Sequence, residues 1–426
     1  MLTRRRILAY SALAPAMLAQ NRLLTSSRQN QTPLRLAVIG NSYVYGSNLQ
    51  IIADRFLVGY PHEGDWHVPN VKIVSAYLPP RPGASHVTAT DLIPERAKEF
   101  GFRLCRNIPE ALRCGGDQLA VDAVLSVVEH GDYPRNHKGQ ILYPRFDFFE
   151  QCAQVFAEEK RAVPYFNHDS LSFSFRQANS MVETAERLKF PLMSGSSLPV
   201  TWRLPDIDIP VGSRIREAIM VCPFDGMEFD GLEAMQCMLE RRKGGETGVK
   251  AVQLLEGDDV WAAGDSGRWS KAVLSSALSR SDAPLGLTLV DGRMQDMASS
   301  GVLPQLVKDP AAYLVEYTDG TRATLLKLDG ADRNFTFSAD LAEHGFIATQ
   351  FFRAPVPNVN YSASLTAKIE QMFVTGVAPY PVRRTLLTTG ILEAAMNSRS
   401  RGNQRVETPQ LGIRYQPPAE SQYART

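Results

Sequence analysis

The sequence has few of the features that mark several common protein classes. Its 426 residues include only five cysteines, none in a C-x-x-C spacing, so we expect neither a disulfide scaffold nor a thiolate metal site or redox pair. The 46 Lys and Arg residues nearly balance the 45 Asp and Glu residues, for a formal net charge of +1. This balance excludes nucleic-acid binding through bulk positive charge and an acidic disordered chain. After the N-terminus, no apolar run is long enough to span a bilayer.

The composition is that of a globular protein with room for more than one domain. Apolar residues make up 44% of the chain and charged residues 21%, the usual balance of a soluble fold. At roughly 100–200 residues per domain, the length predicts two or three domains.

Residues 1–32 have the pattern of a targeting segment. Three consecutive arginines, Arg4–Arg6, precede an apolar stretch, Ile7–Ala19, that is too short to span a membrane. The paired arginines followed by Ile-Leu resemble a twin-arginine export signal, and an ordinary secretory signal with a basic start is the alternative. We therefore expect a periplasmic or secreted bacterial protein that keeps no stable membrane anchor once its signal is removed.

Strands and helices alternate through residues 33–195. Short apolar runs such as Leu34–Gly40 and Asp122–Val128 predict buried parallel strands. Amphipathic segments such as Asn48–Val58 and Phe146–Lys160 predict the helices between them. The alternation predicts a Rossmann-type, doubly wound parallel sheet with helices on both faces, whose ligands lie beyond the carboxyl ends of the strands.

The turn after the first strand is where a dinucleotide-binding fold carries its G-x-G-x-x-G pattern. Here Gly40 matches the first glycine, Ser42 stands at the second, and Gly46 supplies the third if the turn is one residue longer. A Cβ at position 42 would crowd a pyrophosphate on the helix N-terminus, so the cofactor pattern is weaker than the fold pattern. The candidate cofactor-binding residues are Gly40, Asn41, Ser42, Gly46 and Glu129.

The pattern changes in residues 196–400. Strands follow one another, including a predicted hairpin of Ala312–Tyr317 and Thr321–Leu328, while the helices gather elsewhere, the last of them at Arg384–Ala395. This arrangement predicts an α+β C-terminal domain on a mostly antiparallel sheet. The polar residues 401–426 are expected to form a surface arm.

This layout resembles the Gfo/Idh/MocA family of sugar oxidoreductases. Leu34–Gly40 opens the nucleotide domain, Asp122–Val128 is the strand before the family's active-site cleft, and Arg384–Ala395 is the closing helix. The resemblance covers roughly residues 34–400 and rests on layout more than on one motif. It implies that the first domain binds NAD or NADP, that the second binds a sugar or sugar derivative, and that the second domain's sheet forms a homo-oligomer.

The two catalytic positions of the family differ in this chain. Members carry Glu-Lys-Pro after the fifth strand, where this sequence reads Phe166-Asn167-His168-Asp169-Ser170 and has no lysine. Members also carry D-x-x-x-H entering the first helix of the second domain. Here Glu228–Glu233 lies at that place, with Asp230 near the histidine position. Both catalytic groups of the family's hydride-transfer mechanism are therefore substituted.

Other titratable side chains follow the predicted strands. His130 comes directly after one strand, and His168 and Asp169 follow the next, so the three should lie close together at one edge of the sheet. With Asp230 from the second domain they would make an acid–base site, because imidazole titrates near neutrality and a carboxylate can orient it. The catalytic candidates are therefore His130, His168, Asp169 and Asp230. A tightly bonded loop with a surface histidine is the alternative for the segment around His130.

Four further polar residues are candidates for contacts with a sugar: Asp132, Arg135, Trp202 and Arg203. Trp and Arg suit stacking on a sugar and hydrogen bonding to it, and an anchor between domains is the alternative for Trp202. His62 and His67 flank a short loop, but spacing supplies no further ligand, so we predict no metal site.

Three functions stay open at this point. The first is an NAD(P)-dependent oxidoreductase acting on a sugar or sugar derivative. The second is a cofactor-free lyase or hydratase acting on a sugar or keto-sugar through His130, His168 and Asp230. The third is a catalytically silent periplasmic binding protein on the same fold.

Overall fold

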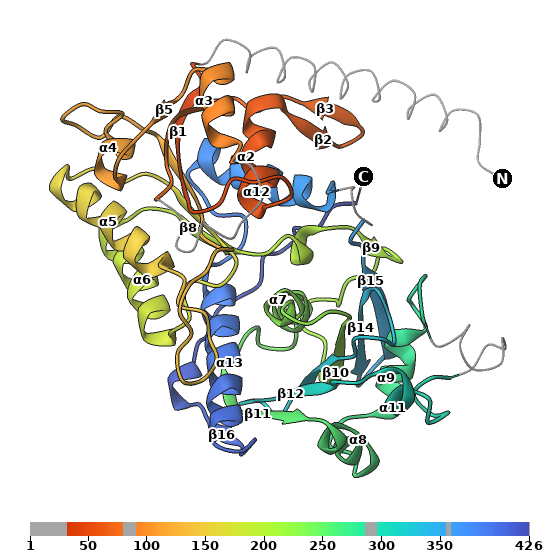
Figure 1. Ribbon diagram of the computed structural model, residues 1–426. Coiled ribbons are helices and arrows are strands. Elements are labelled where there is room, and N and C mark those ends of the chain that lie inside the picture. Colours follow the sequence, from red (N-terminus) through yellow and green to blue (C-terminus); the bar gives the residue numbers. More distant parts are fainter. Residues whose placement is uncertain (1–31, 80–90, 286–295, 355–358, 426) are drawn as a thin grey trace, which may run out of the picture.

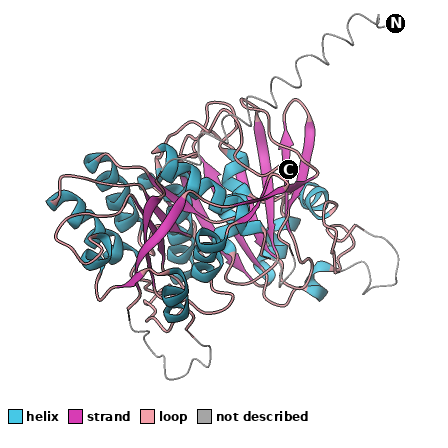
Figure 2. Ribbon diagram, turned by 90° about the horizontal axis from the view of Figure 1, so that it is seen from above, coloured by secondary structure: helices cyan, strands magenta, loops and turns pink. Residues whose placement is uncertain are grey.

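The computed structural model describes residues 32–79, 91–285, 296–354 and 359–425. The predicted signal peptide lies outside the described residues. Within these ranges no helix combines the length and the apolar character needed to cross a bilayer. The described chain forms two large sheets with their helices, which lie side by side, and a small two-stranded sheet (Figures 1 and 2).

The N-terminal sheet has six parallel strands in the order β5-β4-β1-β6-β7-β8. The strands are β1 (Leu34–Gly40), β4 (Val71–Tyr77), β5 (Arg103–Leu104), β6 (Ala123–Val127), β7 (Tyr165–His168) and β8 (Leu192–Gly195). The order reverses between β1 and β6, the switch point at which doubly wound folds bind ligands. The predicted Rossmann-type sheet is confirmed.

Helices cover both faces of this sheet. One face carries α4 (Ile108–Leu112), α5 (Arg145–Glu158) and α6 (Phe175–Leu188), and the other carries α2 (Asn48–Val58) and α3 (Ile93–Phe100). Because both faces are covered, β1 is apolar and buried along most of its length. A Cβ on Gly40 would lie 2.4 Å from Leu49 Cδ2 and 2.8 Å from the Val127 carbonyl oxygen. The close approach of β1 to α2 therefore requires glycine at this position.

The C-terminal sheet has eight strands in the order β16-β11-β12-β13-β10-β14-β15-β9. They are β9 (Arg203–Leu204), β10 (Ile215–Cys222), β11 (Val249–Glu256), β12 (Ala311–Tyr317), β13 (Arg322–Lys327), β14 (Phe335–Leu341), β15 (Gly345–Phe351) and β16 (Val406–Glu407). Only the β10–β13 pair among these runs parallel. The predicted mostly antiparallel second domain is confirmed.

Both faces of the larger sheet also carry helices. On the face toward the N-terminal domain lie α7 (Glu228–Leu239) and α13 (Arg383–Ser400). On the outer face lie α8 (Asp258–Asp265), α9 (Lys271–Leu278) and α11 (Leu303–Leu306), which enclose the buried Trp269. The homo-oligomer expected through this sheet stays a prediction. Contacts across the outer face would involve these helices, because they cover the central strands.

One C-terminal helix returns to the N-terminal domain. α12 (Tyr361–Thr375) packs on α2 and on the hairpin of β2 (Tyr60–His62) and β3 (Asp65–His67). Glu370 on α12 accepts a hydrogen bond from Tyr60 Oη at 2.7 Å and lies 2.8 Å from His67 Nε2. The two domains are thus joined by side-chain contacts as well as by the chain.

The described part of the predicted C-terminal arm lies along the molecule. β16 pairs with β11, and Leu411, Tyr415 and Tyr423 are buried. The guanidinium of Arg203 lies 3.9 Å from the ring centre of Tyr423. The segment that the sequence predicts to be a polar surface arm therefore buries three large side chains.

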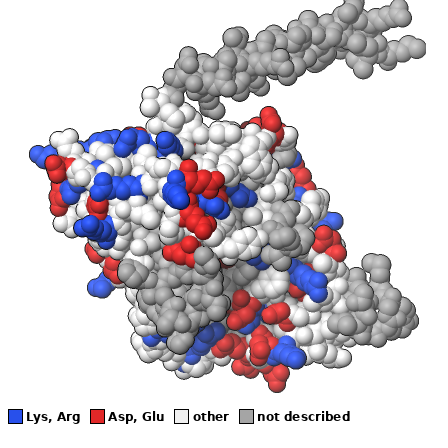
Figure 3. All heavy atoms as spheres, turned by 45° about the horizontal axis from the view of Figure 1, so that its top comes forward, with Lys and Arg blue, Asp and Glu red and all other residues white. Residues whose placement is uncertain are grey.

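Acidic and basic side chains are interspersed on the face of the molecule shown in Figure 3. That face carries no extended basic surface of the kind that bulk binding of a polyanion needs. This agrees with the near balance of charges in the sequence.

Candidate functional site

A cavity of about 570 Å³ lies between the two domains, beyond the carboxyl ends of β1, β6, β7 and β8. Its walls are the first turns of α2, the segments after β6, β7 and β8, the start of α7, and the residues between β15 and α12. Six residues singled out in the sequence line it: Gly46, Glu129, His130, His168, Asp169 and Asp230. The structure therefore brings the four catalytic candidates together, at the edge that the strand order predicts.

His168 and Glu129 form an ion pair in this cavity. His168 ends β7 and Glu129 follows the adjacent strand β6; His168 Nδ1 lies 3.2 Å from Glu129 Oε1, and both side chains are about nine-tenths buried. Burial alone would raise the pKa of Glu129, but the His168 imidazolium outweighs burial and holds that pKa at about 2. Burial alone would lower the pKa of His168, but Glu129 and then Asp169 and Asp230 raise it above the ordinary value. The pair therefore favours the charged imidazolium form of His168.

Arg145 fixes the segments that follow β6 and β7. From the first turn of α5, its buried guanidinium donates to the Val128 carbonyl (3.0 Å), to Ser170 Oγ (2.6 Å) and to Asp169 Oδ2 (2.8 Å). Asp169 has a φ of +66°, an uncommon conformation for a residue with a side chain. Its other oxygen, Oδ1, is buried and has no hydrogen-bond partner within the described chain. Such an acceptor can take a hydroxyl hydrogen from a ligand.

Asp230 faces the same cavity from the first turn of α7. Its enclosed position, followed by the neighbouring Asp169 carboxylate, raises the pKa of Asp230 from 3.8 to about 7. His168, a hydrogen bond with Ser196, and Arg353 act in the opposite direction. A carboxyl with a pKa near 7 can both accept and donate a proton at neutral pH, as general acid–base catalysis requires.

The turn after β1 is longer than the standard fingerprint. α2 begins at Asn48, with Ser47 as its N-cap, and Ser47 Oγ accepts from the Gln50 amide (3.3 Å) and donates to the Ser42 carbonyl (3.0 Å). Ser42 is only 5% exposed and does not line the cavity. The structure thus places Ser42 away from the cavity, and the crowding predicted from a Cβ at this position stays a prediction.

Gly46 takes the place beside the cavity instead. Its φ is +81°, and no atom lies within 4 Å of the position that a Cβ would occupy. Asn41 stays below the turn, where its side chain contacts the loop after β6: Nδ2 donates to the His130 carbonyl (2.8 Å), and Oδ1 accepts from the Glu129 amide (3.0 Å). The open backbone at Gly46 and the first turn of α2 fit a dinucleotide pyrophosphate. Asn41 positions the loop after β6, which lies between this turn and the His168–Glu129 ion pair.

The four sugar-contact candidates lie outside the cavity lining. Asp132 and Arg135 are exposed on the loop after β6, where Arg135 Nη1 donates to the Gly139 carbonyl at 2.7 Å. Arg203 is buried and pairs with Asp208 at 2.8 Å. Trp202 packs edge-on against Phe352, with ring centres 6.4 Å apart. This contact lies beside the β9–β15 pair of the C-terminal sheet, and the roles predicted for Trp202, sugar contact or anchor between domains, stay predictions.

Sequence reasoning missed four cavity or cavity-supporting residues: Arg55, Arg145, Arg353 and Tyr361. Arg55 and Arg145 lie within amphipathic helices, where an arginine usually reads as solvated. Arg353 and Tyr361 come from the segment between β15 and α12, more than 120 residues after Asp230. The sequence offered a clue for Arg55 alone, because this arginine lies on the apolar, buried side of an amphipathic helix.

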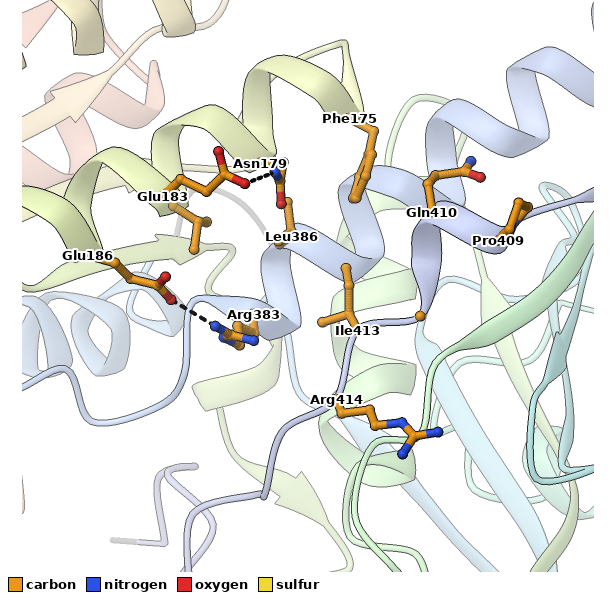
Figure 4. Close-up of a pocket in the computed structure, with 12 residues that line it drawn as sticks. Phe175, Asn179, Glu183, Glu186, Arg383, Leu386, Pro409, Gln410, Ile413 and Arg414 are labelled. Carbon is orange, nitrogen blue, oxygen red and sulfur yellow. Dashed lines mark hydrogen bonds and ion pairs between the residues drawn. The ribbon is translucent and has the colours of Figure 1, made fainter.

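A second hollow, of about 510 Å³, lies on the outside between α6, α13 and residues 409–414 (Figure 4). Its polar side chains are largely satisfied by one another: Asn179 Nδ2 donates to Glu183 Oε1 (2.7 Å), and Arg383 Nη2 donates to Glu186 Oε1 (2.8 Å). None of the residues singled out in the sequence lines it. We assign no chemistry to this hollow.

His62 and His67 lie on the β2–β3 hairpin, away from the cavity lining. His67 is engaged by Glu370, and His62 lies 3.7 Å from Glu63. Over the described ranges, no group of three or more His, Cys, Asp or Glu side chains is arranged to hold a metal ion.

Comparison with solved structures defines the class of fold. It is the two-domain fold of the Gfo/Idh/MocA-type dehydrogenases, as the layout of the sequence suggested. A scan against protein-family models finds no match, and a search of curated proteins finds none either.

Three of the similar structures illustrate the match. GenD2 from gentamicin A biosynthesis, in complex with NAD, has a TM-score of 0.54 at 14% identity over 88% of this chain and 97% of its own. The myo-inositol dehydrogenase from Lactobacillus casei, in complex with NAD(H) and myo-inositol, has a TM-score of 0.52 at 11% identity over 88% and 96%. A probable dehydrogenase from Thermotoga maritima has a TM-score of 0.50 at 13% identity over 89% and 100%. At these identities the likeness defines the fold alone.

Proposed function

We propose that this protein is an NAD(P)-dependent oxidoreductase that acts on a hydroxyl or carbonyl group of a sugar or polyol derivative. The observation that carries the proposal is the pairing of two groups in one cavity. Asp230 has a pKa of about 7, and His168 is held cationic by Glu129. The fold supports the proposal, because two of the similar structures, GenD2 and the Lactobacillus casei enzyme, contain NAD or NAD(H).

The chain's own residues would divide the work as follows. NAD(P), when bound along Gly46 and the first turn of α2, supplies the hydride acceptor or donor. In the oxidising direction the Asp230 carboxylate takes the proton of the reacting hydroxyl, and in the reducing direction the carboxyl returns it. The imidazolium of His168 stabilises the negative charge that develops on the reacting oxygen. His168 would thus serve the purpose of the lysine that the family carries after this strand.

The remaining polar groups would orient the substrate. Asp169 Oδ1, buried without a partner in the described chain, accepts a hydrogen bond from a neighbouring hydroxyl. Arg145 keeps Asp169 and the end of β6 in place. His130, also in the cavity lining, has the exposure to contact a ligand at the rim.

Dinucleotide binding is the first test. The purified protein is denatured, the released NAD(H) or NADP(H) is measured by absorbance and mass, and binding of added NAD(P) is titrated. We expect Gly46→Val to weaken binding at least 10-fold, because its side chain fills the open space beside the turn. Gly64→Val is the matched control: Gly64 has a φ of +80° and equally open surroundings, on the distant β2–β3 turn. Equal binding by the two variants, or no binding by the wild type, would overturn the cofactor assignment.

Turnover is the second test. With NAD(P)+ and a panel of polyols and sugars, we expect Asp230→Asn to lower kcat about 100-fold or more, in the range of a lost general base. Asp259→Asn removes an exposed carboxylate from the first turn of another helix, α8, and should leave kcat unchanged. Conversion of a sugar without any dinucleotide would instead favour the cofactor-free alternative.

The export of this protein stays part of the proposal. It rests on the basic and apolar pattern of residues 1–32. Fractionation of cells that express the full chain tests it. Replacement of the paired Arg4 and Arg5 by lysine should block export by a twin-arginine route and leave a general secretory route intact.

A further inference from the structure

Arg55 is a buried guanidinium without a carboxylate partner. It lies on α2, is 9% exposed and lines the cavity. Nη1 donates to the Ile51 carbonyl (3.1 Å) and Nη2 to the Val359 carbonyl (2.8 Å), while Nε is buried and has no hydrogen-bond partner in the described chain. Burial lowers the pKa of Arg55 from its ordinary value. A buried cation is normally paired with an anion, but the hydrogen bonds of Arg55 go only to neutral carbonyls, and the carboxylate of Asp54 acts on it from further away.

Arg353 is a second cation in the same cavity. It follows β15, is half-buried, and packs over the rings of Phe224 and Tyr361, with its Cζ 5.9 Å and 5.4 Å from their centres. Its Nη1 lies 3.5 Å from Met227 Sδ, and no carboxylate of the described residues lies within ion-pair distance. Arg55, Arg353 and Tyr361 all line this cavity. Two cations thus line one cavity.

The carboxylates of the cavity are already engaged. Asp54 accepts from Arg96 (3.1 Å) and from Tyr43 (2.6 Å). Glu129 is paired with His168, and Asp169 with Arg145. Asp230, with a pKa of about 7, is only partly ionised at neutral pH.

The rest of the chain offers little to neutralise the two arginines. The segments outside the described ranges contain a single acidic side chain, Asp291. The cavity therefore holds two guanidinium groups with no carboxylate of the described residues in an ion pair, and Asp54 and Asp230 act on them only from further away. These two cations need an anion when the cavity is filled.

We propose that the ligand of this cavity is an anionic sugar or polyol derivative, bearing a carboxylate or a phosphate that Arg55 and Arg353 bind beside Tyr361. The proposal rests on the proposed function for the reacting end of the same molecule, near Asp230 and His168. Guanidinium groups suit this task because their fixed donors match the geometry of carboxylate and phosphate oxygens. A neutral sugar would leave Arg55 buried without an anion.

Calorimetry and thermal shift on the full-length protein test the proposal, with saturating NAD+ present so that the cofactor's own phosphates are accounted for. The ligands are matched pairs: D-glucuronate and D-glucose, D-galacturonate and D-galactose, and D-glucose 6-phosphate, with malonate and inorganic phosphate as simple anions. We expect at least one anion to bind 10-fold or more tightly than its neutral counterpart. Comparison of the carboxylate ligands with the phosphate ligands shows which anionic group the site binds.

Variants separate the site from general charge effects. Arg353→Gln should reduce the preference for the anion to less than 2-fold, and Arg353→Lys should restore part of it. Arg414→Gln removes an exposed arginine far from the cavity and should keep the full preference. Thermal unfolding without ligand checks that each variant is folded.

Two results would overturn the inference: no anion stabilises the wild type more than it stabilises Arg353→Gln, or the neutral and anionic members of every pair bind equally. Dinucleotide binding, measured on the same samples without sugar, tests the oxidoreductase proposal independently. Anion preference without dinucleotide binding would keep this inference and reject the proposed function. Dinucleotide binding without anion preference would do the reverse.

Discussion

Replacing Asp230 by asparagine should change how the stability of the protein depends on pH. In the folded chain the pKa of Asp230 rises from 3.8 to about 7, chiefly because the carboxyl is enclosed. A carboxyl whose pKa is raised by folding contributes stability that is present at low pH and is lost as the pH rises through the folded pKa. At 1.36 kcal/mol per pH unit, the loss between pH 4 and pH 8 is about 4 kcal/mol at most.

Urea unfolding of the wild type and of Asp230→Asn at pH 5, 6, 7 and 8 measures this effect. The variant keeps a neutral side chain of the same shape, so its advantage over the wild type should grow from pH 5 to pH 8 by more than 1 kcal/mol. Asp259→Asn, which changes an exposed carboxylate, should run parallel to the wild type. Parallel curves for Asp230→Asn and the wild type would refute the raised pKa, and with it the role of Asp230 as an acid–base group at neutral pH.

Three further outcomes follow from the same geometry. Glu129→Gln removes the main group that raises the pKa of His168, so the alkaline limb of the pH–kcat profile should move to lower pH; an unchanged limb would separate His168 from catalysis. Arg145→Lys loses the fork of three hydrogen bonds and should lower kcat about 10-fold at a nearly unchanged KM, with a lysine variant of equal activity counting against a positioning role. Gly40→Ala places a Cβ 2.4 Å from a methyl of Leu49 and should destabilise the fold by about 1–3 kcal/mol in urea unfolding; a neutral effect would contradict the close approach of β1 to α2.

The sequence was most informative where one local pattern decides the structure. Leu34–Gly40 and Asn48–Val58 form elements with the predicted bounds, because the first is an unbroken apolar run, the second has helical spacing, and each has a clear end. The order of these elements sufficed to predict both sheets. The four catalytic candidates could be grouped because the ends of neighbouring parallel strands meet.

Features that depend on packing between distant parts of the chain could not be predicted from the sequence. α7 begins at Glu228, although Gly231 reads as a loop residue. The glycine lies inside the helix, where a Cβ would be 2.5 Å from Leu325 Cδ1. The β2–β3 hairpin was read as a loop, since its support comes from Glu370, about 300 residues away. The two cavity arginines were missed for the same reason: their lack of acidic partners is a fact of the fold.

The order in which the chain is made has a consequence for when this cavity can exist. The last of the described residues that line it are Arg353, Val359 and Tyr361, and the ring of Tyr423, further along the chain, lies against the guanidinium of Arg203. The amide of Ala424 donates to the carbonyl of Val200, which lies two residues after Leu198 of the cavity lining. A ribosome that has released only the N-terminal domain has therefore made the ion pair but not the site. Ligand binding should be acquired only after Tyr361 has left the ribosome, long after the N-terminal sheet is complete, and truncation before Tyr423 should weaken it even though both large sheets are complete.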